Sequence, residues 1–216
     1  PLAVAFIYKE GLKNILAFAI PIVALAVLGI LLQIPKPNRD TLYQKEGFAL
    51  TALVWVVMTL AGAVPLVING DVPNYIDAWF EIMSGFTTTG ASILNNVEAL
   101  SHGLLYWRSF THWIGGMGVL VFLLAILPMA GGSHMHLMKA ESPGPSVDKF
   151  VPRVKDTAKI LYTLYVGITL LQIVCLLLAK MPLFDTLTLT FGTVGTGGFG
   201  VKTAVLEITP HYSKTL

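Results

Sequence analysis

Two stretches of this sequence repeat one another and decide its fold. The first reads Asp77-Ala-Trp-Phe-Glu-Ile-Met-Ser-Gly-Phe-Thr-Thr-Thr-Gly90, and the second reads Asp185-Thr-Leu-Thr-Leu-Thr-Phe-Gly-Thr-Val-Gly-Thr-Gly-Gly198. In both, an Asp stands thirteen residues ahead of a Gly, and a short apolar segment ends in a cluster of Thr and Gly. Similarity of this kind within one chain indicates an internal repeat of one structural unit.

The sequence around the repeats is typical of a membrane protein. Hydrophobic residues make up 55% and charged residues 12% of the 216 residues, and the mean hydropathy is +0.73; soluble domains carry roughly 25% charge. A helix needs about 20 apolar residues to cross a bilayer. Four stretches meet that length, namely 15–32, 48–68, 107–129 and 160–179. The net charge of +2 is too small and too dispersed for a nucleic-acid surface, so we expect membrane lipid and no nucleic acid as a partner.

Basic residues predict how these spans are oriented. The connections after the first and third spans carry Lys36, Arg39 and Lys45, and Lys139, Lys149, Arg153, Lys155 and Lys159, whereas the connection between the second and third has no Lys or Arg before Arg108. By the positive-inside rule the basic connections are cytoplasmic. Both repeats then face the other side, which for a bacterial inner membrane is the periplasm.

The expected fold is an all-α polytopic membrane protein. Its units have the form helix, re-entrant pore helix plus filter loop, helix, as in K⁺ channels. We expect an N-terminal helix and cytoplasmic loop at 1–46, a complete unit at 47–130, a basic cytoplasmic loop at 131–156, and a second unit without its closing helix at 157–216. Residues 1–9 read as the tail of a further element.

The Thr and Gly clusters are the candidate cation site. Non-helical backbone at membrane depth is costly unless it lines a wet cavity, and backbone carbonyls there can replace the water shell of a K⁺ ion. The absence of carboxylates from both clusters favours a monovalent cation. The predicted filter comprises Thr87, Thr88, Thr89 and Gly90 with Gly195, Thr196, Gly197 and Gly198, and the carbonyls predicted to bind K⁺ are those of Thr88, Thr89, Gly90, Thr196, Gly197 and Gly198.

The second filter loop has an alternative position in the sequence. The string Thr193-Val194-Gly195 is similar to the filter of classical K⁺ channels, so an alternative filter includes Thr193 and Val194 and aligns Gly195 with Gly90. We prefer Gly198, because it keeps the spacing from the Asp equal in both copies.

Asp77 and Asp185 are expected to cap the two short helices, since a carboxylate can accept hydrogen bonds from the free N–H groups of a helix N-terminus.

Several longer strings resemble the Trk, Ktr and HKT superfamily of potassium transporters, and most closely the pore-forming subunits of bacterial Trk systems. They are Phe80-Glu81, Ser84-Gly-Phe-Thr-Thr-Thr-Gly-Ala91, Trp113-Ile-Gly-Gly-Met-Gly118 with Ile126-Leu-Pro128, Lys139-Ala-Glu-Ser-Pro-Gly-Pro145 and Thr193-Val-Gly-Thr-Gly-Gly-Phe199. The resemblance implies four such units around a pseudo-fourfold axis. Gly90 and Gly198 would be the first two filter glycines, and the other two units would lie in a missing second half.

The same resemblance implies partners and a transported ion. It implies a homodimer, and a cytosolic nucleotide-binding regulatory subunit that the loop 131–153 is placed to contact. It also implies that K⁺ is the transported ion, and no cofactor is expected. We expect no enzyme activity, because no Gly-x-Ser-x-Gly or His-Glu-x-x-His string occurs.

Other readings stay open at this point. Two copies of a double-unit chain, as in two-pore-domain potassium channels, would also give four loops; an intramembrane enzyme is less favoured. Gly115, Gly116 and Gly118 fit either a hinge or close helix packing. Arg108 and His112 fit either an outer vestibule or, as we expect, the membrane interface. His134 and His136 lack the further ligands that a metal site needs.

Overall fold

The chain folds as an assembly of helices. A computed structural model describes residues 1–33, 44–130 and 150–202, and these contain helices and no strand. The elements are α1 (Leu2–Ile7), α2 (Leu12–Gln33), α3 (Gln44–Asn69), α4 (Tyr75–Phe86), the 3₁₀ helix η1 (Val97–Ala99), α5 (His102–Ala130), α7 (Phe150–Leu178) and α8 (Leu183–Val194). The predicted all-α class is confirmed.

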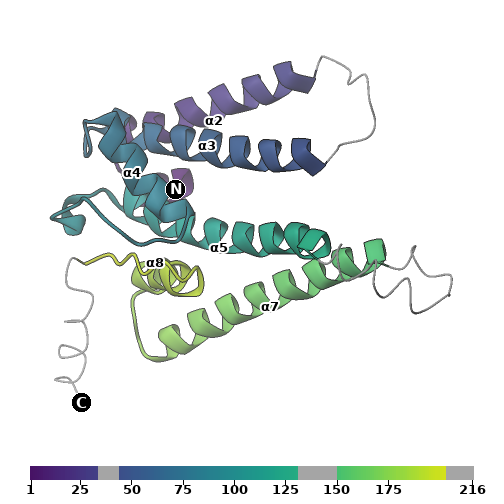
Figure 1. Cartoon of the computed structure of the whole chain (residues 1–216). Helices are drawn as coiled ribbons and strands as arrows, with labels where there is room; N and C mark the ends of the chain where they lie inside the picture. Colours follow the sequence, from purple (N-terminus) through teal and green to yellow (C-terminus); the bar gives the residue numbers. More distant parts are fainter. Residues whose placement is uncertain (34–43, 131–149, 203–216) are drawn as a thin grey trace, which may run out of the picture.

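The long helices match the predicted spans. Among the described residues, three helical stretches are long and apolar enough to cross a membrane, at Leu12–Leu32, Ala49–Asn69 and Thr157–Leu178. The remaining predicted span, 107–129, falls within α5, which is 29 residues long. Figure 1 shows α2 and α3 side by side, with α5 between that pair and α7. The proline inside α2, Pro21, does not end the helix.

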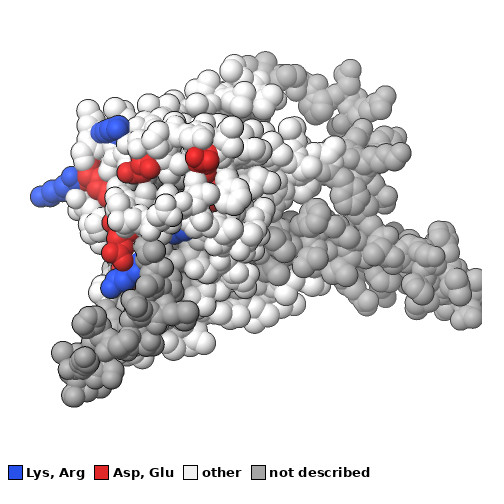
Figure 2. Space-filling view, turned by 60° about the vertical axis from the view of Figure 1, so that its left-hand side comes forward, with Lys and Arg blue, Asp and Glu red and all other residues white. Residues whose placement is uncertain are grey.

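Large parts of the described surface are apolar. Figure 2 shows Lys, Arg, Asp and Glu gathered at one end of the molecule, while most of the rest of the described surface in that view is uncharged. Large apolar side chains of α2, α3 and α7 are exposed, including Ile30 at 65%, Leu53 at 59% and Leu171 at 64%. Such a surface suits contact with lipid chains or with further helices.

The two short helices α4 and α8 lie at the same end of the assembly. Each has twelve residues, and both pack against α5 (Figure 1). The apolar face of α4 enters the main core, which comprises Phe18, Ala63, Leu66, Val72, Ala78, Ile82, Phe86 and Leu104. Because this core draws on α2, α3, α4 and α5, the first short helix is fixed from several sides.

Helix α5 is the element that holds both short helices. A Cβ built on Gly115 would lie 2.0 Å from the carbonyl oxygen of Phe86, at the end of α4, and one built on Gly116 would lie 3.1 Å from the Cα of Gly195, just after α8. Of the two readings of these glycines, the structure favours close packing: a side chain at either position would push a loop away. Gly118 faces the ring of Trp55 at 3.1 Å.

Helix α7 is joined to α5 by hydrogen bonds between side chains and backbone. The hydroxyl of Tyr165 donates to the carbonyl of Trp113 at 3.0 Å, and the Trp113 Nε1–H donates to Thr169 Oγ1 at 3.1 Å. Buried polar groups that are paired in this way tie membrane helices together without exposing polar atoms to lipid. The second unit is therefore fixed to the first through α5.

Replacement of Gly115 tests this packing. We expect Gly115→Ala to destabilise the protein by about 1–3 kcal/mol, the usual cost of overpacking, because the clash is with backbone rather than with a flexible side chain. The matched control is Gly167→Ala on α7, where no described atom lies within 4 Å of the added methyl group. Thermal melting of the purified protein in detergent measures both; equal melting temperatures for the two variants would contradict the packing role.

Candidate cation-binding loops

The backbone after each short helix follows the same path. Thr88 and Thr196 have φ angles of 55° and 60°, and Gly90 and Gly198 have φ angles of +75° and +82°. Positive φ is rare for threonine and readily adopted by glycine. Its occurrence at two pairs of equivalent positions means that the repeat seen in the sequence is also a repeat of backbone conformation.

Hydrogen bonds repeat in the same register. The N–H groups of Thr89 and Gly197 donate to the carbonyls of Ser84 and Gly192, each at 3.0 Å. Thr88 and Thr196 donate to Gly85 and Thr193 at 3.1 and 2.9 Å. The conformation thus aligns Gly90 with Gly198, as the Asp spacing predicts. The alternative alignment with Gly195 does not match, since Gly195 has a φ of −69° and Thr193 and Val194 still belong to α8.

The two loops meet. A Cβ built on Gly90 would lie 1.9 Å from the carbonyl oxygen of Gly197, so only glycine permits this approach. Gly90 and Gly197 are half-buried, and Gly198 is exposed. The structure therefore brings the two predicted glycine clusters into direct contact.

Threonine hydroxyls near the loops bond to the protein itself. Thr87 Oγ1 donates to the Met83 carbonyl at 2.7 Å and lies 2.9 Å from Thr89 Oγ1, and Thr193 Oγ1 donates to the Leu189 carbonyl at 2.7 Å. These bonds go to carbonyls in the last turns of the short helices, and the Met83 carbonyl also accepts the Thr87 N–H at 2.9 Å. Backbone carbonyls of the loops are thus better placed than these hydroxyls to face an ion.

The prediction that Asp77 and Asp185 are the helix caps is wrong. The cap of α4 is Asn74, whose side chain accepts a hydrogen bond from the N–H of Ile76 at 3.0 Å. The equivalent position before α8 is Pro182, which provides no side-chain cap. Both aspartates lie instead in the first turn of their helices. There a carboxylate still complements the positive end of the helix dipole, which explains the misleading spacing.

A buried ion pair lies behind the loops. Glu81 on α4 and Arg108 on α5 are 0% and 4% exposed, and Arg108 Nε donates to Glu81 Oε1 at 2.5 Å. The expectation that the Arg108 side chain snorkels to lipid headgroups is therefore wrong, because it is buried and its partner is a carboxylate from the first repeat. The sequence contained one signal, because Glu81 has no acidic equivalent in the second repeat, where Leu189 stands.

Phe199 and His112 complete the packing behind the second loop. The rings of His112 and Phe199 stack with centroids 4.1 Å apart, and both residues are buried. A Cβ built on Gly197 would lie 2.0 Å from His112 Nδ1, so the imidazole lies directly against the loop. Like Arg108, His112 is buried inside the protein and not exposed at the membrane interface as we expected. Only its contacts in three dimensions reveal its position.

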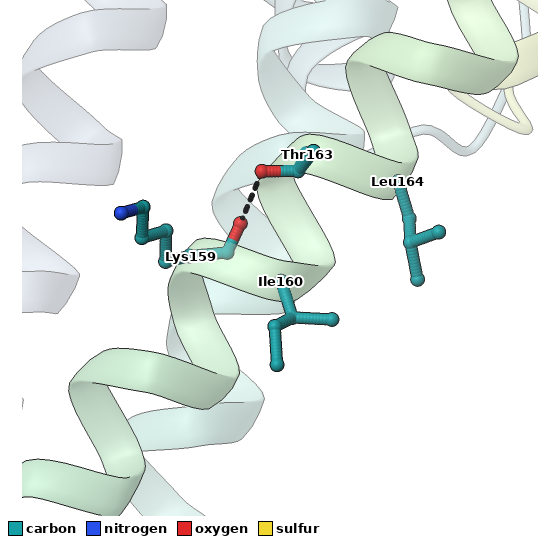
Figure 3. A pocket seen from close by; sticks show the side chains of 4 residues that line it. All are labelled: Lys159, Ile160, Thr163 and Leu164. Carbon is teal, nitrogen blue, oxygen red and sulfur yellow. Dashed lines mark hydrogen bonds between the residues drawn. The ribbon is translucent and has the colours of Figure 1, made fainter.

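The described residues also line a hollow away from the two loops. A shallow hollow of about 430 Å³ along α7 is lined by Lys159, Ile160, Thr163 and Leu164, and Figure 3 shows Thr163 donating to the carbonyl of Lys159, at 2.8 Å. All four residues come from one helix, far along the sequence from either loop. Within the described residues no group of His, Cys, Asp and Glu is suited to hold a metal ion. His134 and His136 lie outside the described residues.

Comparison with known proteins places the chain in a family. Residues 14–207 match the TrkH family, whose description is cation transport protein. The chain belongs to the TrkH family. It is 39% identical over 207 residues to the Trk system potassium uptake protein TrkH of Salmonella typhimurium, which covers 94% of this chain and 42% of that protein.

A solved structure and a further relative support the same family assignment. The crystal structure of the potassium transporter TrkH from Vibrio parahaemolyticus matches with a TM-score of 0.75 and 32% identity, over 94% of this chain and 40% of that chain. An uncharacterized cation transporter of Methanocaldococcus jannaschii is 33% identical over 203 residues. The chain spans less than half the length of these relatives. The resemblance drawn from the repeats and the longer strings is confirmed.

The corrected cap provides a test of local stability. Asn74→Ala removes the side-chain acceptor at the start of α4, so we expect it to cost about 0.5–2 kcal/mol. Asp77→Asn removes only a charge near the dipole end and is expected to cost less, about 0.3–1 kcal/mol. Melting temperatures of the two variants in detergent give the comparison. A larger loss for Asp77→Asn would make the aspartate the principal N-terminal group after all.

Proposed function

We propose that this chain is part of a potassium-uptake protein and supplies two of the loops of its selectivity filter. K⁺ would bind to the backbone carbonyls of Thr88, Thr89, Gly90, Thr196, Gly197 and Gly198 in place of water. The observation that carries this proposal is the contact between two loops of identical backbone conformation at Gly90 and Gly197. Relatives named as potassium uptake proteins support the choice of ion.

The way in which the loops touch supports a ring of more than two. Gly90 contacts Gly197, whose equivalent in the first loop is Thr89 rather than Gly90. Two equivalent units related by a twofold axis would exchange identical contacts, whereas a contact between non-equivalent positions is head-to-tail and closes only as a ring. A filter of four loops fits this geometry, with two loops from this chain and two from a second half.

The orientation and partners follow from the same proposal. The loops would face the periplasm of a bacterial inner membrane, because the sequence concentrates Lys and Arg in the connections after the first and third spans, which the positive-inside rule makes cytoplasmic. Further pore-loop units, a second subunit and a cytosolic nucleotide-binding regulatory subunit would complete the assembly. Further units in the same polypeptide are favoured over a dimer of two-unit chains, since the matched relatives are more than twice as long as the matched segment. An intramembrane enzyme finds no support in the described residues.

Substitution of Gly90 tests the filter. We expect Gly90→Ala in the full-length protein to abolish K⁺-dependent growth rescue and rubidium uptake, because alanine is disfavoured at a φ of +75° and its methyl group would meet the Gly197 carbonyl. Gly70→Ala is the matched control, with a φ of +85° but a position away from the loops, where its nearest described contact is Lys13 Nζ at 3.2 Å. Normal uptake by Gly90→Ala would disprove the site.

The number of loops provides a second test. Residues 1–216 alone contain two repeats, and two carbonyl clusters cannot surround a dehydrated ion on all sides. Liposomes that contain only this segment should therefore show rubidium flux no greater than empty liposomes, whereas the full-length protein should conduct. Appreciable K⁺-selective flux from the segment would favour assembly from two-unit chains instead.

A further inference from the structure

The ion pair of Glu81 and Arg108 has no obvious reason to exist for stability alone. Both side chains are almost completely buried, and taking two charges out of water is costly. Replacing such a pair by apolar residues of similar volume is often neutral or even stabilising. The further contacts of the two side chains are therefore the better guide to their role.

Glu81 holds the segment that leaves the first loop. Its Oε1 accepts a hydrogen bond from Ser92 Oγ at 2.9 Å, and its Oε2 accepts one from the Ile93 N–H at 3.0 Å. Ser92 and Ile93 follow Gly90 by two and three positions. The carboxylate therefore fixes the course of the chain directly after the first glycine cluster.

Arg108 holds the segment that leaves the second loop. Its Nη1 donates to the Gly200 carbonyl at 3.2 Å, and its guanidinium carbon lies 3.6 Å from the centroid of the Phe199 ring. Gly200 is the equivalent of Ser92 in the repeat. The ion pair thus links equivalent positions of the two loops through one continuous chain of contacts, from Ser92 through Glu81 and Arg108 to Gly200.

We propose that Glu81 and Arg108 are positioning residues that set the separation of the two filter loops and thereby the preference for K⁺ over Na⁺. The inference rests on the proposed function. Discrimination between these ions depends on where the carbonyls stand and how strongly they interact with the ion, so a small displacement of one loop changes it. The second repeat has Leu189 in place of Glu81, which makes Arg108 the charged group that holds its loop.

A positioning role and a purely electrostatic role predict different effects of removing one charge of the pair. Glu81→Gln leaves an unbalanced positive charge near the ion path, and Arg108→Gln leaves an unbalanced negative charge. If the pair acted only through its field, the first variant would weaken cation uptake and the second would strengthen it. If the pair positions the loops, both variants move a loop and both reduce the preference for K⁺.

The experiment measures competition between rubidium and sodium during uptake by the full-length protein, per molecule that elutes as a single species from detergent size exclusion. We expect Glu81→Gln and Arg108→Gln each to lower the K⁺ over Na⁺ preference about tenfold, equal to ~1.4 kcal/mol of differential binding. The double variant should lose little more than either single variant, because the two residues act as one unit. Ser109→Ala is the matched control: Ser109 is buried next to Arg108, and its hydroxyl has no hydrogen-bond partner among the described residues.

Milder variants keep the test decisive if the glutamine variants do not fold. Arg108→Lys retains the charge, but one ammonium group cannot serve Glu81, Gly200 and the Phe199 ring in the same geometry, so we expect a several-fold loss of preference. Phe199→Leu should cause a smaller loss in the same direction. The positioning role would be overturned if the K⁺ over Na⁺ preference stayed unchanged in every folded variant. It would also be overturned if this preference fell in one glutamine variant and rose in the other. Absence of K⁺ uptake by the unmodified protein would instead overturn the proposed function.

Discussion

The close approach of α5 to the ends of both short helices is the constraint on which the rest of the structure depends. Gly115 touches the last residue of α4, and Gly116 touches the residue that follows α8. Any side chain at these positions would separate the helix from one loop or the other. Because the same helix meets both loops one residue apart, it fixes the position of the second repeat relative to the first. The contact between Gly90 and Gly197 then follows from that placement.

Much of the fold could be predicted from sequence, because membrane helices and internal repeats leave strong local signals. Length and hydropathy place three of the spans within about three residues of the apolar stretches Leu12–Leu32, Ala49–Asn69 and Thr157–Leu178. The equal spacing from Asp77 to Gly90 and from Asp185 to Gly198 predicts the alignment that the backbone angles follow. The spacing is informative because both short helices have the same length. Aligning Gly195 with Gly90 would shift the second repeat by three residues, and its short helix would then have to be shorter by nearly a turn.

The contacts behind the loops could not be predicted in the same way. Arg108 at the start of a long apolar helix is compatible with either a lipid interface or an internal partner, and local sequence does not distinguish them. The distinction lies with Glu81, which is close in space only because α4 packs against α5. A comparison of the two repeats does contain a hint. A buried carboxylate present in one copy and replaced by Leu189 in the other marks a residue whose partner is specific to one unit. The cap was mispredicted for the opposite reason, since Asn74 and Asp77 both suit a helix start and only geometry separates them.

The two loops share one backbone conformation, but different side chains hold them in place. The first loop is held by a carboxylate from its own short helix, and the second by a guanidinium from the helix that closes the preceding unit. The second loop lies against α5, which closes the preceding unit, through Arg108 and His112. The pair is neutral as a whole, so the loops gain support without a net charge beside them. Under the proposed function, backbone carbonyls would then be the groups that interact with the ion, and their placement would decide selectivity.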